Sequence, residues 1–400
     1  MSDRPRLGRN IIVLCGVSLL QDAASELLYP VLPLFLTGVL GAPVAVVGLI
    51  EGVAEATASI TKVAGGRLAD RRPRKPLIEA GYAISSVGKL IIALSFVWPT
   101  VLVARVVDRI GKGTRTGPRD ALLVTDAPPE LRGRAFGLHR AADTTGAVIG
   151  PLLALLIYEV AHHNIRLVLV VAVVPALASV ALTGLIRERR RSIPVSPTAG
   201  RGPAEPLPGV FWRVVTFLVL FGLVNFPDAL LILRANELGF GFVRVVLVYA
   251  LYNASYAALS YPAGAISDRV PRRWVFATGL AIFAVAYTGL GLLTYQTRAW
   301  VWVLFAVYGG YTALTDGVGK AWVSDLLPPA DFGTGLGLYQ GLAGGAALVA
   351  GIWAGLAWGG TGQLPLLVSG LTVGVLAIGL ALGGARLEGG ARKDATTTRM

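Results

Sequence analysis

Pairs of carboxylic acids spaced four residues apart occur in two long apolar stretches, Asp22 with Glu26 and Glu51 with Glu55. On a helix, residues four apart lie on one face, so each pair brings two acidic groups close together. Because two neighbouring carboxylates in apolar surroundings resist being ionised together, such a pair can take up and release a proton. We therefore predict that these four acids couple the protein to protons. The alternatives are that the first pair is structural and that the second faces water or pairs with Lys89.

Arg105 and Asp108 place opposite charges three residues apart in a later apolar stretch. A buried guanidinium beside a carboxylate commonly tunes the proton affinity of that acid. We assign both residues to proton coupling, with the alternative that Arg105 only anchors the end of its helix.

Further polar residues interrupt other apolar stretches, and such residues inside a membrane mark functional sites by default. We expect the following residues to face a substrate cavity: Tyr29, Arg140, Asp143, Asn225, Asp228, Asp316 and Lys320. Asp228 has no obvious charged partner on its own helix, which favours contact with a substrate or a proton. Asp316 and Lys320, four residues apart, would alternatively form a fixed ion pair.

Other chemistries find little support in the sequence. No set of nucleophile, base and orienting residue is recognisable, so we expect no enzyme activity. The single cysteine, Cys15, excludes an internal disulfide, and adjacent His162 and His163 favour a metal site only weakly. Phosphate-binding loops are absent, so we expect no cofactor and an ion gradient, most simply of protons, as the energy source.

The composition predicts an integral membrane protein. Of 400 residues, 54% are hydrophobic and only 15% are charged, whereas a soluble domain carries about 25% charged residues. The net charge of +13 comes from short Lys and Arg clusters between apolar runs, which leaves no continuous basic face for nucleic acid. We expect the lipid bilayer and a small-molecule substrate as partners, and a monomer.

Apolar runs of spanning length predict twelve transmembrane helices. They lie near 11–39, 44–68, 75–97, 98–117, 134–160, 165–186, 211–235, 241–267, 273–295, 299–325, 333–359 and 363–385. Basic residues occupy every second loop, which by the positive-inside rule puts both termini in the cytoplasm and the protein in the cell's inner (plasma) membrane.

The chain divides into two related halves. Gly66, Asp70 and Arg71 match Gly264, Asp268 and Arg269 at a constant offset of 198 residues. A repeat in the same orientation predicts two parallel bundles with a cavity between them. The predicted domains are a six-helix bundle over 1–186, a cytoplasmic linker over 187–210, a second six-helix bundle over 211–386 and a cytoplasmic tail over 387–400.

The repeated loop resembles the signature of the major facilitator superfamily. That signature has a glycine, three residues, Asp-Arg, one residue and Gly-Arg-Lys, although Pro73 and Pro271 here replace the inner glycine. The resemblance implies a conformational switch made of Gly66, Asp70, Arg71, Arg74, Asp268 and Arg269. An ordinary basic cluster that stops membrane insertion is the alternative.

A second motif resembles the antiporter signature of helix 5 in that family. It consists of Gly137, Gly146, Gly150 and Pro151, while the usual glycine pair beyond the proline is missing. Small residues permit close helix packing and proline bends a helix, so we expect this helix to seal the interface between the halves against proton leak.

Together these observations predict an all-α membrane protein, with twelve helices in two six-helix bundles related by a pseudo-two-fold axis. The resemblance implies a secondary transporter, and the helix 5 motif favours proton-coupled efflux by antiport. A proton-coupled importer or facilitator is the alternative within transport. A membrane sensor without transport is the alternative from another class.

Overall fold

The computed structural model describes residues 8–69, 72–126, 132–187, 207–267, 269–327 and 332–388, and these residues form helices and no β-strand. The first half of the chain contains α1 (Arg9–Leu28), α2 (Leu32–Leu34), the π-helical turn η1 (Phe35–Val39), α3 (Val44–Ala69), α4 (Arg74–Ala93), α5 (Trp98–Asp126), α6 (Arg132–Val160), α7 (Ile165–Val171) and α8 (Val173–Thr183). The second half contains α9 (Gly209–Gly222), α10 (Asp228–Glu237), α11 (Phe242–Ser267), α12 (Arg272–Leu292), the short η3 (Arg298–Trp300), α13 (Val301–Asp325), α14 (Phe332–Leu356) and α15 (Gln363–Glu388).

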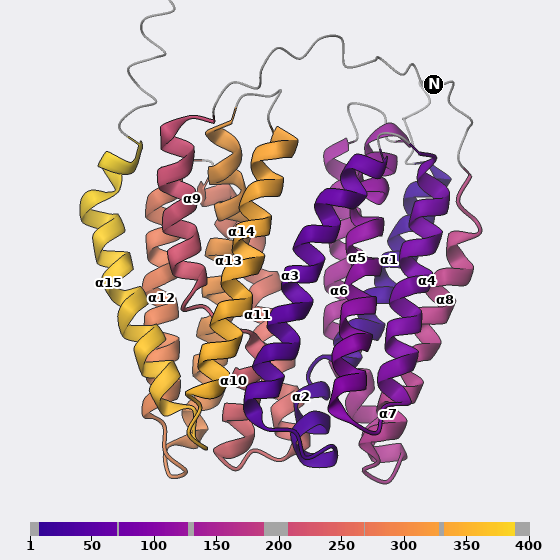
Figure 1. Ribbon diagram of the computed structural model, residues 1–400, viewed down its shortest axis with the longest axis horizontal. Coiled ribbons are helices and arrows are strands. Elements are labelled where there is room, and N and C mark those ends of the chain that lie inside the picture. The colour runs from indigo at the N-terminus through magenta and orange to yellow at the C-terminus, as the bar shows by residue number, and fades with distance from the viewer. Residues whose placement is uncertain are drawn as a thin grey trace, which may run out of the picture.

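The helix axes lie roughly along one common axis, and the helices form two groups that lie side by side (Figure 1). Helices α1 to α8 make up one group, here called the N-half, and α9 to α15 make up the C-half. We call the end of the molecule where α1 and α9 begin the linker side, and the opposite end the far side (Figure 1). This arrangement confirms the predicted all-helical fold class.

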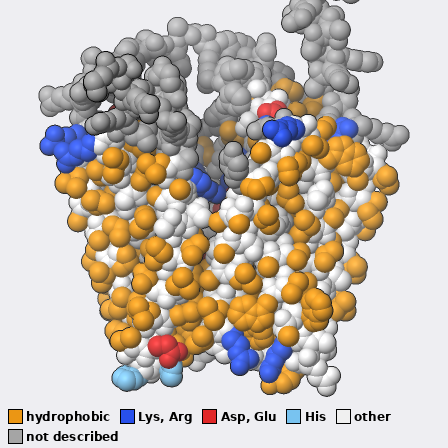
Figure 2. Space-filling model, turned by 180° about the vertical axis from the view of Figure 1, so that it is seen from behind, with side chains coloured by type: hydrophobic (Ala, Val, Ile, Leu, Met, Phe, Trp, Pro, Cys, Tyr) orange, Lys and Arg blue, Asp and Glu red, His pale blue; other side chains and the backbone are white. Residues whose placement is uncertain are grey.

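The surface around the helices is suited to lipid. Hydrophobic side chains cover the flanks of the molecule, while charged side chains gather at its two ends (Figure 2). Nine helices of the described chain are long and apolar enough to cross a membrane. The predicted twelve therefore stays a prediction, because α5, α13 and the interrupted α9–α10 segment are not among these nine.

Two predicted spans are broken inside the structure. Helix α1 ends at Leu28, before Pro30 and Pro33, and the chain continues to Val39 as α2 and η1. In the C-half, the predicted span 211–235 is wrong as one continuous helix, because α9 stops at Gly222 and α10 begins at Asp228. Proline lacks a backbone N–H and suits the beginning of a helix, and Pro227 is the residue that immediately precedes α10.

Helix α5 is longer than predicted. The apolar pattern placed its end near residue 117, whereas the helix continues to Asp126. Its polar residues do not end the helix, because the N-half gives them partners: Arg105 and Asp108 are buried in ion pairs, and Arg115 donates a hydrogen bond of 2.6 Å to the Ser85 hydroxyl.

The two halves touch along α3 and α14, where glycines allow the backbones to meet. A Cβ atom added to Gly48 would lie 2.0 Å from the carbonyl oxygen of Gly351, and one added to Gly351 would lie 2.3 Å from the carbonyl oxygen of Gly48. Small residues are what permits such close helix contacts in membranes. In contrast, a Cβ atom added to Gly345, on the same helix α14, would have no heavy atom within 4 Å.

Two substitutions on α14, one at the contact and one away from it, test the close approach of α3 and α14. Gly351→Val should push α14 away from α3 and destabilise the protein by about 1–3 kcal/mol, the usual cost of overpacking. Gly345→Val, where space is open, should leave stability near the wild-type value. Thermal unfolding of both variants in detergent tests this, and an equal loss of stability would contradict the close α3–α14 contact.

Candidate functional site

A cavity of about 410 Å³ lies between the two halves. Its volume falls within the range of about 300–1,000 Å³ typical of small-molecule sites. Aromatic residues and acids make up most of its wall: Glu55, Asp228, Asp316, Tyr252, Tyr308, Tyr311 and Tyr339. Glu55 comes from α3 of the N-half, and the others come from the C-half. The surface between the halves is hollowed on the linker side, and basic side chains are visible in that hollow (Figure 2).

Asp228 lies at the helix break and is fixed by its surroundings. It is the first residue of α10, where free backbone N–H groups and the helix dipole favour a negative charge. Its carboxylate accepts a hydrogen bond of 2.7 Å from the Tyr308 hydroxyl. The Tyr308 ring in turn stacks on Tyr252 with ring centroids 5.2 Å apart. The broken span therefore presents an oriented carboxylate among tyrosines at the cavity.

Asp316 connects the cavity wall to the N-half. Lys320 donates to its carboxylate at 2.7 Å, so the two residues form the ion pair that their spacing allows. The Tyr256 hydroxyl donates to the same carboxylate at 3.0 Å, and Arg140 of α6 donates to the Tyr256 hydroxyl at 3.0 Å. A chain of polar contacts therefore runs from one half to the other.

Glu26 makes a second polar contact between the halves. Its carboxylate on α1 accepts a hydrogen bond of 2.7 Å from the Tyr249 hydroxyl on α11. Tyr29, which directly follows the last residue of α1, stacks on the same tyrosine ring with 5.5 Å between centroids. Tyr249 thus binds both a carboxylate and an aromatic ring of the opposite half.

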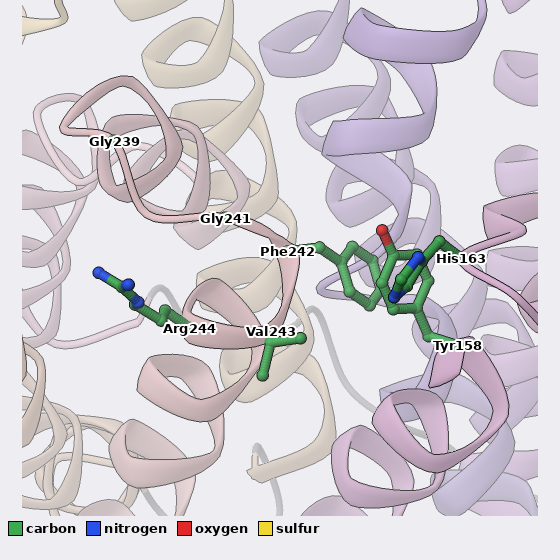
Figure 3. Close-up of a pocket in the computed structure, with 7 residues that line it drawn as sticks. All are labelled: Tyr158, His163, Gly239, Gly241, Phe242, Val243 and Arg244. Atoms are coloured by element: carbon green, nitrogen blue, oxygen red, sulfur yellow. The ribbon is translucent and has the colours of Figure 1, made fainter. Parts of the chain in front are cut away.

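Aromatic side chains also join the halves on the far side. Tyr158 near the end of α6 stacks on Phe242 at the start of α11, with ring centroids 3.9 Å apart (Figure 3). The His163 ring lies beside the Tyr158 ring, with 4.9 Å between centroids (Figure 3). Together with the Glu26–Tyr249 and Tyr29–Tyr249 contacts, this stack closes the α1/α6 side of the interface toward the far side.

The glycines of the helix 5 motif have a different neighbour from the predicted one. A Cβ atom on Gly146 would lie 2.7 Å from the carbonyl oxygen of Leu19, and one on Gly150 would lie 2.7 Å from that of Ala23. Both contacts are with α1 in the same half, so these two glycines do not meet the opposite half; the sealing of the interface by this helix stays a prediction. They instead allow α6 to approach the helix face that carries Asp22 and Glu26. The side-chain surroundings of Gly137 lie outside the described residues.

The two acids of the second pair, Glu51 and Glu55, have different surroundings. Glu51 is buried and accepts two hydrogen bonds from one nitrogen of Arg105, at 2.6 and 2.8 Å. Glu55, one turn along α3, is exposed to the cavity. The two carboxylates therefore do not form the facing pair that their spacing suggested, and only Glu55 is accessible to a substrate.

Lys89 and Asp108 complete a buried ion network in the N-half. The Lys89 ammonium lies 2.9 Å from Asp108, so the suggested pairing of Lys89 with Glu51 or Glu55 is not formed. Arg105 lies 3.7 Å from the same carboxylate. Four opposite charges on α3, α4 and α5 thereby neutralise one another. The proposed proton-coupling roles of Arg105 and Asp108 stay predictions.

Two more of the predicted cavity residues have defined partners. Asn225 lines the cavity and donates a hydrogen bond of 2.9 Å to the Tyr311 hydroxyl. Asp143 instead turns toward α1, where it accepts a hydrogen bond from Ser18, and its carboxylate lies 3.4 Å from His139. Asp143 is thus placed beside α1 and away from the tyrosine wall.

The predicted conformational switch is only partly visible. Asp70, Arg71 and Asp268 lie outside the described residues. Arg74 at the start of α4 donates a hydrogen bond of 3.0 Å to the Ala121 carbonyl near the end of α5. The Arg269 side chain is exposed. The switching role therefore stays a prediction.

The sequence analysis singled out Tyr29 alone and missed six tyrosines of the site: Tyr249, Tyr252, Tyr256, Tyr308, Tyr311 and Tyr339. Their spacing offered a signal, because Tyr252 and Tyr256 lie four apart and Tyr308 and Tyr311 three apart, each on one helix face. Aromatic residues at such spacing pack in most membrane helices, so the pattern alone does not separate a binding wall from ordinary core.

Comparison with known proteins gives a consistent family. The sequence model described as Major Facilitator Superfamily matches residues 14–252 and 214–396. An uncharacterized MFS-type transporter of Methanocaldococcus jannaschii is 32% identical over 359 residues, covering 88% of this chain and 89% of that protein. The multidrug resistance protein MdtH of Aeromonas hydrophila is 26% identical over 362 residues. The match covers 86% of this chain and 88% of the MdtH chain.

Solved structures share the fold at low sequence identity. The peptide transporter POT superposes with a TM-score of 0.80 at 13% identity, covering 96% of each chain. The nucleoside transporter NupG superposes with a TM-score of 0.75 at 14% identity. The match covers 94% of this chain and 99% of the NupG chain. At such identities the likeness concerns the fold alone.

The buried network predicts a specific stability pattern. Arg105→Gln leaves Glu51 without its cation, which should cost about 3–5 kcal/mol because an unpaired buried charge is strongly unfavourable. Adding Glu51→Gln should recover most of the loss, since two neutral amides can replace the ion pair. Thermal unfolding of the single and double variants measures this.

Arg298→Gln is the matched control for loss of one positive charge. Arg298 lies in η3 and stacks on Tyr295 at 3.8 Å, and exposed contacts of that kind contribute only about 1 kcal/mol. A double variant no more stable than Arg105→Gln would contradict the Glu51–Arg105 pairing.

Proposed function

This chain belongs to the Major Facilitator Superfamily, and we propose that within this family of transporters it works as a proton-coupled antiporter that exports a small molecule. The cavity between the halves is the proposed substrate site. Alternating access would move the two halves so that the cavity opens to the linker side in one state and to the far side in the other.

The Glu26–Tyr249 hydrogen bond is the observation that carries this proposal. It joins α1 to α11 across the interface, so the halves cannot separate on the far side without breaking it. A hydrogen bond to an ionised carboxylate is worth about 1.5–3 kcal/mol, against about 0.5–1.5 kcal/mol for a neutral one. Protonation of Glu26 therefore weakens a bond that holds the far side closed.

This behaviour fits antiport better than symport. An antiporter stays coupled only if the empty, unprotonated carrier does not switch, whereas a symporter must switch when it is empty. The ionised Glu26 holds the empty carrier in one state, and a proton releases it. A substrate must do the same by making contacts that are stronger in the other state, because only such differential binding shifts an equilibrium.

The direction of transport is supported by charge placement and by relatives. Basic residues concentrate in the loops on the linker side, which the positive-inside rule assigns to the cytoplasm. The hollow on the linker side would then open to the cytoplasm (Figure 2). Relatives named multidrug resistance protein MdtH fit export. Import through the same geometry is the alternative, and the sign of the coupled proton flux distinguishes the two.

The proposed coupling predicts a pH-dependent change of state without any substrate. Spin labels at Val160→Cys and Val243→Cys, in a Cys15→Ser background, would report the far-side distance beside the Tyr158–Phe242 stack. Acidification should raise the population with the larger distance, because the protonated Glu26 holds Tyr249 less strongly. A loss of about 1 kcal/mol corresponds to roughly a fivefold change in the ratio of states.

Glu26→Gln should show the larger distance already at neutral pH and lose most of the pH response. Tyr249→Phe, which removes the donated hydrogen, should behave in the same way. Glu79→Gln is the matched control, because Glu79 is an acid on α4 that pairs with Lys75 at 3.6 Å. An unchanged pH response in Glu26→Gln would overturn the assigned role of Glu26.

Transport itself is tested in liposomes under an imposed pH gradient, with lumenal pH recorded while candidate substrates are added. Antiport predicts that substrate moving one way drives protons the other way. In Glu26→Gln, gradient-driven movement should be lost while exchange of substrate for substrate remains. Proton and substrate moving in the same direction would replace antiport by symport.

A further inference from the structure

The three acids that line the cavity differ in whether a basic side chain neutralises them. Asp316 forms its ion pair with Lys320 at 2.7 Å. Glu55 is opposed electrostatically by Lys62, two turns along the same helix. Asp228 has no such partner, because within the described ranges no Lys or Arg nitrogen lies within 4.0 Å of its carboxylate. One acid of the cavity is therefore left without a cation of the protein.

The surroundings of Asp228 favour its ionised form without neutralising it. As the first residue of α10 it lies at the positive end of the helix dipole, and the Tyr308 hydroxyl donates a hydrogen bond of 2.7 Å to it. The charged side chains that act on it electrostatically are themselves acids, Glu26 and Glu51. A carboxylate inside the membrane without a cation is unfavourable, so a cation that enters the cavity gains a partner at Asp228.

The wall around Asp228 suits an organic cation. The Tyr308 ring lies 5.2 Å from the ring of Tyr252 and 5.1 Å from that of Tyr311, measured between centroids. Phe221 extends this aromatic surface, 6.1 Å from Tyr311. Aromatic faces attract a positively charged nitrogen and pack well against flat apolar groups. The wall therefore offers an attachment for the charge and a surface for the body of one molecule.

A bare metal ion fits this site less well. Hard cations need about six oxygen ligands gathered around one point. In the part of the chain that the structure describes, no three His, Cys, Asp or Glu side chains are grouped so as to hold a metal. The cavity volume of about 410 Å³ is also far larger than an ion needs and matches a small organic molecule.

We propose that the substrate is an organic amine with one positive charge and a flat apolar body, whose ammonium group donates to the Asp228 carboxylate while its body packs against the tyrosine rings. This inference names a substrate class for the cavity and so rests on the proposed transport function. It also separates two roles: Asp228 of the C-half binds the substrate cation, whereas Glu26 of the N-half responds to the proton.

The test is equilibrium binding to the full-length protein in nanodiscs at neutral pH, without a pH gradient. Aromatic amines, neutral alcohols and carboxylic acids form three sets matched in size and ring system. The thermal unfolding midpoint is recorded with each compound, and stabilising compounds are titrated to obtain Kd. The amines should bind at least about tenfold more tightly than the alcohols and the acids, because only the amines form a charge-assisted hydrogen bond with Asp228.

Asp228→Asn keeps the shape of the side chain and removes its charge, so it should weaken amine binding about tenfold or more and leave alcohol binding nearly unchanged. Asp325→Asn is the matched control, because Asp325 is an acid at the end of α13 that pairs with Arg272 outside the cavity. It should bind amines as the wild type does.

Two further variants separate the parts of the site. Tyr252→Leu removes an aromatic face and no charge, so it should weaken amine binding by about fivefold, the loss of one cation–π contact. Glu26→Gln should bind amines within about fivefold of the wild type, because the substrate cation is assigned to Asp228. The comparison of amines with alcohols uses the wild type alone, so it decides the question of charge even where a variant does not fold.

Several results would overturn the inference: alcohols or acids that bind as tightly as the amines, amine binding that Asp228→Asn leaves unchanged, or a folded wild type that no amine stabilises. Loss of amine binding in Glu26→Gln but not in Asp228→Asn would contradict the assignment of the cation to the C-half. An unchanged pH response of the far-side distance in Glu26→Gln would instead overturn the coupling mechanism and leave amine binding standing, so the two failures are distinguishable.

Discussion

Ionised side chains inside an apolar slab need partners, and this requirement organises the structure. Arg234 shows it plainly: its buried guanidinium donates to the carbonyls of Leu290, Leu293 and Thr361 at 2.6 to 3.1 Å. Those bonds tie the end of α12 to the segment before α15. The ion network around Arg105 does the same for α3, α4 and α5. Charges that have such partners hold neighbouring helices of one half together, because breaking these contacts leaves a buried charge uncompensated.

The contacts between the halves are of two physical kinds. Along α3 and α14 the backbones meet over glycines such as Gly48 and Gly351, and such packing depends on shape and not on protonation. Between α1/α6 and α11 the contacts are aromatic stacks and hydrogen bonds from tyrosine hydroxyls, as at Glu26 and Tyr249. Only the second kind changes when a carboxylate gains a proton. Under the proposed coupling, the α3–α14 side would act as a hinge surface and the side with Glu26 and Tyr249 as a releasable contact.

Much of the fold could be predicted because its signals are local. Apolar length, basic loops and the repeated loop motif lie within short windows of sequence, and they indicated the helical membrane fold and the two halves. The breaks near Pro30 and Pro227 follow from the missing backbone N–H of proline, although both segments were predicted as single spans. Asp316 and Lys320 pair as their spacing of four allows, because both lie on one helix.

The partners of residues on different helices were decided by tertiary structure. Glu51 and Glu55 have the same spacing as Asp22 and Glu26, yet Glu51 is paired with Arg105 and Glu55 faces the cavity. The sequence by itself determined which ionisable residues lie within the membrane, because burial of a charge is visible as a polar residue in an apolar run. Which of them are neutralised and which stay free for protons or substrate depends on how neighbouring helices rotate and pack, and that is set by contacts far apart in the chain.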